Sequence, residues 1–195
     1  MKIPDLLYHY TVGPKIGLIS DSGYLKPFGF GKAVNAREKP ILWWSTNPHW
    51  EPTATKLISL DRGKTYGRPP LEKLHEIVGC YRFCLNTKRL DSLSPADIKL
   101  LPWSRLPLVA GIDSKDVHQM VMAGLSVGAQ PNQWWGCLDQ VPLDLETLGS
   151  LTVEVLDNGR WTPLTGTPEA LALASANTRT IVQSLASQVP STALR

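Results

Sequence analysis

Short runs in which apolar and polar residues alternate are the main pattern of this chain, and they predict strands. These runs lie at residues 6–11, 40–46, 76–86 and 133–141. Two more runs, at 151–156 and 160–164, flank Asp157-Asn158-Gly159. Asn followed by Gly is typical of the two-residue turn of a β-hairpin, so these last two runs are predicted to pair with each other.

Helical spacing is rarer and occurs in three places. Residues 15–22 follow Gly13-Pro14 and precede Gly23, which suits the left-handed end of a helix. Asp113-Ser114 predicts the cap of a helix over 115–125. Its inward-facing residues are expected to be Val117, Met120, Val121 and Gly124. A third, weakly amphipathic helix is predicted from Thr167 to about residue 186.

The order of these elements predicts an α+β fold. Strands and helices do not alternate as they do in a doubly wound parallel sheet. At 195 residues the chain has the length of one domain, which we place at 1–166, followed by a helical tail at 167–195. The sequence contains neither the Gly-x-Gly-x-x-Gly motif nor the phosphate-binding Gly-x-x-x-x-Gly-Lys-Ser/Thr loop. A nucleotide, if one binds, is therefore expected to bind by another scheme.

Composition narrows the classes of protein further. Apolar residues make up 43% of the chain and charged residues 19%, which is enough for a packed core. The net charge of +3 is too small to indicate nucleic-acid binding by itself. The number of cysteines is odd, 3, which argues against a disulfide framework. A zinc site usually needs two clusters of Cys or His, and the sequence lacks the second, so we expect no metal site. We expect a cytoplasmic protein with no membrane partner, because no apolar run has the length of a membrane span.

Two strands and the loop after the second carry side chains suited to binding. His9 and Thr11 are two residues apart and share one face of the first strand. In the second strand, Trp43 and Trp44 place a large ring on each face, and one of them, for which we choose Trp44, suits the floor of a pocket for a flat ligand. Glu51 follows at a turn, where a carboxylate is well placed. Each of these residues also has a purely structural alternative. His9 could bond to the backbone in a half-buried strand, the tryptophan could belong to the core, and Glu51 could cap a helix.

These segments resemble ADP-ribosyltransferase-fold proteins. The opening LLYHYTVGPKIGLISDSGYLKP is similar to their first β-α unit, as it stands in DarT toxins and RNA 2′-phosphotransferases. LWWST followed by NPHWE is similar to the aromatic-Ser-Thr strand of the same superfamily. QWWGCLDQVPL lies where these families place the strand bearing their catalytic glutamate. The resemblance covers roughly the first 60 residues and, more loosely, residues 76–142.

The resemblance implies a split, strongly bent β core that binds NAD as a substrate without a Gly-rich loop. It implies that His9 bonds a ribose of NAD, with Thr11 beside it and Tyr24 stacked on the nicotinamide. Ser45 and Thr46 would brace the site. The implied activity is transfer of ADP-ribose to a macromolecular acceptor, protein or nucleic acid, as in toxin-like transferases of bacteria or phages.

The chain departs from the family pattern at the catalytic glutamate. Asn132 and Gln133 occupy its position, and Gln has the shape of Glu without its charge. The candidate catalytic residues are therefore Gln133 itself and Glu51, with Asp139 after them.

Two other functions stay open. One is a non-catalytic module that binds a nucleotide or a protein through a tryptophan-rich surface of Trp50, Trp103, Trp134 and Trp135. The other is an RNA 2′-phosphotransferase, which needs basic side chains converging on a phosphate; the candidates for this are Lys15, Arg37 and Arg82.

Overall fold

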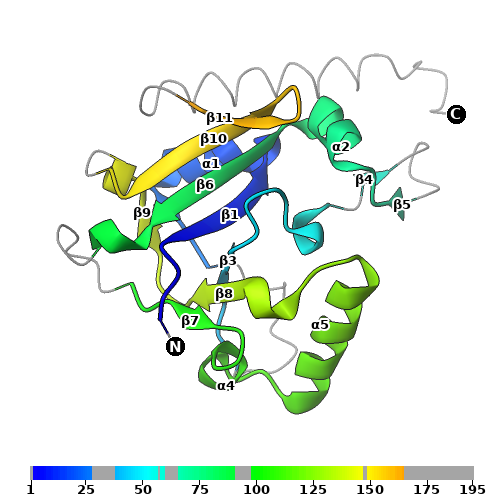
Figure 1. Ribbon diagram of the computed structural model, residues 1–195, viewed down its shortest axis with the longest axis vertical. Helices are drawn as coiled ribbons and strands as arrows, with labels where there is room; N and C mark the ends of the chain where they lie inside the picture. Colours follow the sequence, from blue (N-terminus) through cyan, green and yellow to red (C-terminus); the bar gives the residue numbers. More distant parts are fainter. Residues whose placement is uncertain are drawn as a thin grey trace, which may run out of the picture.

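The computed structural model describes residues 2–27, 38–56, 58–59, 66–90, 98–146 and 149–164. These residues form a seven-stranded sheet, two small two-stranded sheets and a few short helices (Figure 1). Every strand pair in this part of the chain is antiparallel. The predicted α+β class is confirmed.

The strands are β1 Leu6–Val12, β2 Tyr24–Leu25, β3 Leu42–Ser45, β4 Ile58–Ser59, β5 Tyr66–Gly67, β6 Cys80–Asn86, β7 Leu101–Pro102, β8 Trp134–Cys137, β9 Val141–Pro142, β10 Leu151–Asp157 and β11 Arg160–Pro163. The α-helices are α1 Gly13–Ser22, α2 Leu71–Val78, α4 Leu106–Ala110 and α5 Ser114–Ser126. Single 3-10 turns are η1 Pro52–Ala54, η2 Thr87–Arg89, η3 Pro131–Gln133 and η4 Leu143–Glu146.

The large sheet consists of a first half, β11-β10-β6-β1, and a second half, β3-β8-β7, which meet where β1 pairs with β3. Its strand order is β11-β10-β6-β1-β3-β8-β7. The ladder between β1 and β6 runs the whole length of both strands, from Leu6 opposite Asn86 to Val12 opposite Cys80. In contrast, β1 and β3 pair at one position, Tyr8 opposite Ser45. The two halves therefore diverge immediately beyond this pair.

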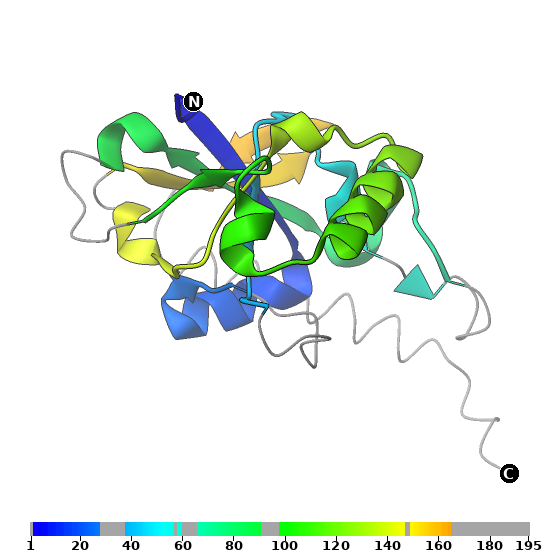
Figure 2. The same cartoon turned by 90° about the horizontal axis from the view of Figure 1, so that it is seen from below.

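Opposite faces of the first half support different layers. Odd-numbered residues of β1 point to the side of α1, where Leu7, Ile16, Phe83 and Leu85 form the main core. Figure 2 shows α1 on this side of the sheet. Even-numbered residues point to the other side. There Val12 packs with Leu74 of α2 in a smaller core that also includes Cys80 and Leu156.

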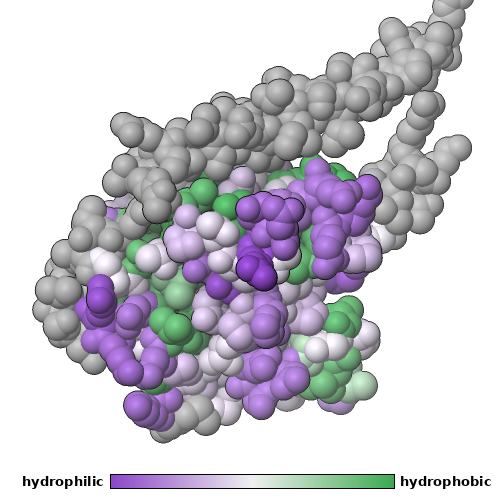
Figure 3. Space-filling view, turned by 45° about the horizontal axis from the view of Figure 1, so that its top comes forward, coloured by the Kyte–Doolittle hydropathy of each residue, from purple (hydrophilic) through white to green (hydrophobic). Residues whose placement is uncertain are grey.

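Helices α4 and α5 pack on the second half of the sheet. Figure 1 shows them beside β7 and β8, away from α1. Leu106 and Ala110 of α4 pack against Ile41 and Leu101. On the face of the molecule that Figure 3 shows, the coloured residues are mostly polar, and apolar residues appear among them in small separate groups.

Most of the predicted elements are confirmed, with local causes that match the prediction. Gly23 ends α1 in the left-handed conformation at φ 69°. Asp113 caps α5 by accepting from the backbone N–H groups of Lys115 and Asp116. Asn158 and Gly159 both have positive φ in the β10–β11 turn, as a type I′ hairpin requires.

Two predicted strands are partly wrong. The segment 76–86 begins as a helix, because Glu76, Ile77 and Val78 form the last turn of α2 and Gly79 ends it at φ 70°. Ile77 and Val78 belong to the apolar side of α2, and they fit the predicted strand equally well in the sequence. The segment 133–141 divides into β8 and β9, which belong to different sheets. The predicted helix at 167–186 and the tail 167–195 lie outside the described residues.

The structure also bears on the expected lack of a membrane span and on the cysteines. Among the described residues, no helix has the length and apolarity to cross a membrane. Cys80 and Cys84 share one face of β6, and all three cysteines are free, in line with the argument against a disulfide framework. Burial raises the pKa of Cys80 to about 12 and that of Cys137 to about 11, so these thiols are unreactive at neutral pH.

We expect Gly124→Ala to destabilise the protein, although alanine favours a helix. A Cβ at position 124 would lie 2.4 Å from the indole of Trp134, on β8. The loss should be about 1–3 kcal/mol in the free energy of unfolding, as for other overpacked cores. Urea denaturation measures it, with Ser126→Ala, at an exposed position of the same helix, as the control. Unchanged stability of Gly124→Ala would contradict the close packing of α5 on β8.

Candidate functional site

The residues predicted to form the site lie on both faces of the sheet. His9 and Thr11 are odd-numbered residues of β1 and point to the side of α1. Trp44 packs in the main core on the same side, with its ring centroid 5.8 Å from that of His9. Ser45 pairs with Tyr8 and therefore points to the opposite face. The sheet thus separates Ser45 from His9.

The His9 side chain crosses the gap between the two halves. Its Nδ1 is 2.8 Å from the carbonyl oxygen of Trp43, on β3. A carbonyl oxygen only accepts, so Nδ1 carries the proton. Burial, the largest cause, and the positive charge of Lys56 lower the pKa of His9, and the hydrogen bond to Trp43 raises it; the resulting pKa is about 4. At neutral pH the ring is therefore uncharged, with Nε2 as an acceptor.

Within the described residues, Nε2 of His9 has no hydrogen-bond partner. The side chain is also partly exposed, in contrast to Leu7 beside it on the same face, which is 0% exposed. The ring is held on one edge by Trp43 and keeps an acceptor on the other. This arrangement suits a hydroxyl group of a ligand.

The other predicted ligand contacts are placed less favourably. Thr11 is 5% exposed, and Trp44 is 2% exposed inside the main core. A ring so enclosed offers no free face for stacking, which favours the core alternative for Trp44. Tyr24 is 37% exposed and precedes the fully buried Leu25, so it points away from the core on which His9 packs. The roles of these residues in ligand binding stay predictions.

Thr46 and Gln133 are neighbours at one end of the second half. The backbone N–H of Thr46 donates to the carbonyl oxygen of Gln133 at 3.0 Å, which extends the β3–β8 ladder by one bond. The position at which the resemblance predicts a glutamate is therefore next to the Ser-Thr segment. The neutral Gln133 brings hydrogen-bonding groups there and no charge.

Glu51 is buried on the opposite face and its carboxylate is occupied. It is 6% exposed. Its Oε2 accepts from the Ser45 hydroxyl at 2.9 Å. Its Oε1 accepts from the Thr53 hydroxyl at 2.9 Å and from the indole N–H of Trp134 at 3.1 Å. The carboxylate thus ties β3, η1 and β8 together, and it also caps η1.

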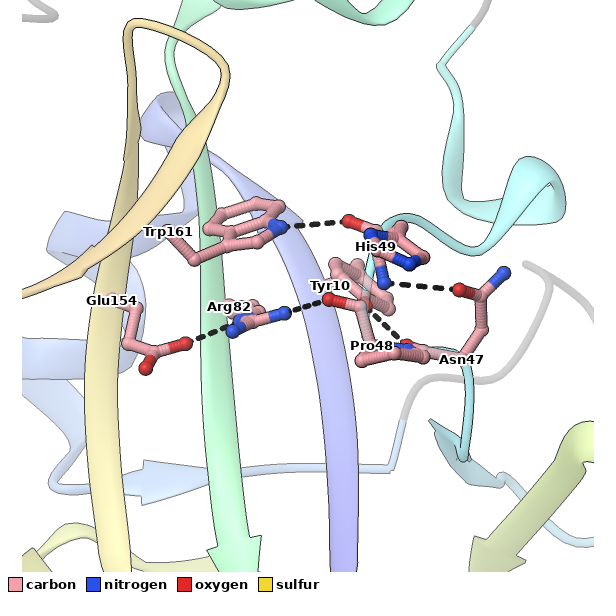
Figure 4. A network of polar contacts seen from close by, with 7 residues as sticks. All are labelled: Tyr10, Asn47, Pro48, His49, Arg82, Glu154 and Trp161. Carbon is pink, nitrogen blue, oxygen red and sulfur yellow. Dashed lines mark hydrogen bonds and ion pairs between the residues drawn. The ribbon is translucent and has the colours of Figure 1, made fainter.

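A second network of polar contacts covers the face of β1 and β6 that carries Tyr8 and Tyr10 (Figure 4). Arg82 forms an ion pair with Glu154 of β10 and donates to the carbonyl oxygen of Pro48. Its guanidinium lies 4.5 Å from the ring centroid of Tyr8 and 4.6 Å from that of Trp161. Arg82 is only 8% exposed, and a buried charge is costly without partners. The ion pair and the two aromatic rings supply those partners.

The loop after β3 is held by the same network. Tyr10 donates through its hydroxyl to the carbonyl oxygen of Asn47, and the indole N–H of Trp161 donates to that of His49 at 2.7 Å. Trp50 stacks on Trp161 with ring centroids 6.2 Å apart and planes 8° apart. Sequence reasoning missed Tyr10 and Trp161. Arg82 was among the candidate basic residues, and its charge among mostly apolar neighbours in β6 is a signal in the sequence that it needs a partner.

The remaining candidates do not converge on one place. Arg82 is engaged in the network above, and Arg37 lies outside the described residues. The carboxylate of Asp139 is exposed and accepts from the backbone N–H of Lys99 at 3.4 Å. Trp134 and Trp135 are 6% and 4% exposed, so neither contributes to a tryptophan-rich surface. The described residues contain no group of acidic, His or Cys side chains that would hold a metal ion.

Comparison with known proteins gives no further guide to function. No model of a protein family, no curated protein and no solved structure matches this chain. Function is therefore argued from the residues and their geometry.

Replacement of Glu51 should show whether its carboxylate is structural. We expect Glu51→Ala to lower the free energy of unfolding by about 2–4 kcal/mol, because Trp134 and Ser45 would keep buried donors without an acceptor. Glu51→Gln keeps the shape and one acceptor oxygen and should lose less than half as much. Urea denaturation of both variants measures this. Equal stability of Glu51→Ala and the wild type would refute the structural role.

Acid should destabilise the protein through His9. The pKa of His9 in the folded protein is about 4, below the usual 6.5, so the unfolded chain binds a proton first as the pH falls. Stability should decline from about pH 6.5 and level off near pH 4, with a total loss of about 3 kcal/mol from this group. His9→Gln should lack this part of the decline. His118→Gln, at an exposed position of α5, is the control and should retain it.

Proposed function

We propose that this chain is an ADP-ribosyltransferase-like protein that binds NAD at the divergence of β1 and β3, beside His9. One observation carries the proposal. His9 is held as an uncharged ring, with Nδ1 bonded to Trp43 and Nε2 available as an acceptor. A ribose hydroxyl of NAD would donate to Nε2, which is the role that the family resemblance gives to this residue.

The sheet supports the same proposal in a second way. The family resemblance implies a split sheet with NAD lying across it and no Gly-rich loop. In this chain β1 and β3 pair at one position only, and His9 lies next to that position. Lys56 acts on His9 with a positive charge, which suits a ligand that carries phosphates.

Transfer of ADP-ribose makes a further demand, because cleavage of the nicotinamide–ribose bond develops positive charge on the sugar. A carboxylate close to the ribose stabilises that charge. The candidate Glu51 is engaged by three side chains on the other face, and Gln133 has no charge. This observation favours a second candidate function, a module on the same scaffold that binds NAD without turnover.

Calorimetric titration with NAD tests the binding step. We expect the wild type to bind NAD and His9→Ala to bind it about tenfold more weakly, since a buried acceptor for a ligand hydroxyl is lost. His118→Ala, at an exposed position, is the control for the loss of one imidazole and should bind NAD normally. Equal affinity of His9→Ala and the wild type would remove the proposed site.

Nicotinamide release separates the two candidate functions. Transferase activity predicts release by the wild type with NAD and a mixture of protein, RNA and DNA acceptors. The binding module predicts none, together with a gain of release in Gln133→Glu, which restores a carboxylate at the position of the family's glutamate. Gln130→Glu adds the same charge at a nearby exposed position and should not release nicotinamide.

A further inference from the structure

An open hollow lies on the face of the sheet opposite to His9, between the loop after β3 and the start of α2. Its volume is about 390 Å³. Trp50, Pro52, Pro69, Pro70, Leu71 and Val127 form its apolar walls, and Arg68 and Thr55 are its polar lining residues. A volume of this size lies in the range of small-ligand sites, and such sites combine apolar walls with a few polar groups.

The indole of Trp50 is fixed in place at the wall of this hollow. Its Nε1 donates to the Thr55 hydroxyl at 2.9 Å. Trp161 stacks parallel to it, and the Tyr10 ring lies 5.0 Å from it between centroids. A ligand that stacks on Trp50 would therefore meet a ring that is already ordered, which lowers the entropic cost of binding.

Arg68 brings a positive charge to the lining of the hollow, and the charge of Lys56 lies close enough to interact with it. The guanidinium of Arg68 donates to the carbonyl oxygen of Thr55 at 2.8 Å, and this bond uses one of its five N–H groups. Lys56 is the next residue after Thr55. Partial burial lowers the pKa of Lys56, and the positive charges of Lys15 and Arg68 lower it further. These cations repel one another, and a bound anion would relieve that repulsion.

We propose that this hollow binds a nucleoside phosphate, with the base against Trp50 and the phosphate at Arg68 and Lys56. A flat apolar ring matches the indole and the three prolines. A phosphate matches a guanidinium that presents several donors in one plane. Inorganic phosphate would leave the apolar walls uncovered, and an uncharged ring would leave the cations unpaired, so the combination fits the hollow better than either part.

This inference does not rest on the proposed function, because no residue of the hollow contacts His9 in the described structure. Two sources of the ligand share the required chemistry. One is the adenosine phosphate half of a dinucleotide that passes between β1 and β3 to reach His9 on the opposite face, and the other is a separate nucleotide, free or in a chain.

Equilibrium titration of the full chain with AMP, adenosine and inorganic phosphate tests the inference. We expect AMP to bind about tenfold more tightly than either adenosine or phosphate. Arg68→Gln should weaken AMP about tenfold, as expected for one lost charge-assisted hydrogen bond, and Lys56→Gln should weaken it several-fold. Arg160→Gln, an exposed residue of β11, removes the same charge elsewhere and should change nothing.

The NMR signal of the Trp50 indole tests the stacking of the base separately from the binding of the phosphate. In NMR spectra the N–H signal of Trp50, assigned through Trp50→Phe, should shift with AMP and adenosine and not with phosphate. Equal AMP affinity of Arg68→Gln and the wild type, or an indole signal unmoved by AMP, would overturn the proposal.

Competition identifies the source of the ligand. Displacement of AMP by NAD, lost in His9→Ala, indicates a dinucleotide that spans both places. Simultaneous binding of AMP and NAD indicates a separate nucleotide. AMP binding to His9→Ala at wild-type affinity supports the hollow even if the NAD proposal fails.

Discussion

Outside the hydrophobic core that both halves of the large sheet share, the halves are joined by side chains that bond to backbone carbonyl groups. Backbone pairing between β1 and β3 stops at Tyr8 and Ser45. Beyond it, His9 bonds to the carbonyl of Trp43, Tyr10 to that of Asn47 and Arg82 to that of Pro48. These bonds satisfy carbonyl groups that a continuous ladder would have used. They also leave a divergence in the sheet that a continuous ladder would have closed.

The two faces of this junction differ in the charge of their side chains. The face toward α1 holds an uncharged imidazole with an available acceptor. The other face holds three charged groups, Arg82, its ion-pair partner Glu154 and Glu51, and each has partners that neutralise or solvate it. A buried charge with a full set of partners stabilises the fold and is a poor reactant, because reaction would first have to remove a partner. The contrast explains why we place ligand chemistry at His9.

Sequence reasoning predicted the local elements better than the site. Period-two alternation and turn residues predicted β1, the β10–β11 hairpin and the cap of α5, because these depend on neighbouring residues. The assignment of 76–78 to a strand was wrong, since an amphipathic helix that ends at Gly79 has a similar apolar pattern. The separation of Ser45 from His9 depends on the register between β1 and β3, which neither strand encodes alone. The partners of Glu51 are equally non-local, since Trp134 lies 83 residues away.

The contact between Trp161 and the carbonyl of His49 joins positions 112 residues apart. During synthesis on the ribosome, the loop after β3 emerges long before the hairpin that holds it. Contacts of such long sequence separation form late and slow the folding of a chain. The Trp50 ring, which stacks on Trp161, therefore acquires its final position only when β11 has been added. A shortened product that ends before residue 161 would contain every lining residue of the hollow and lack the Trp161 ring that stacks on its wall.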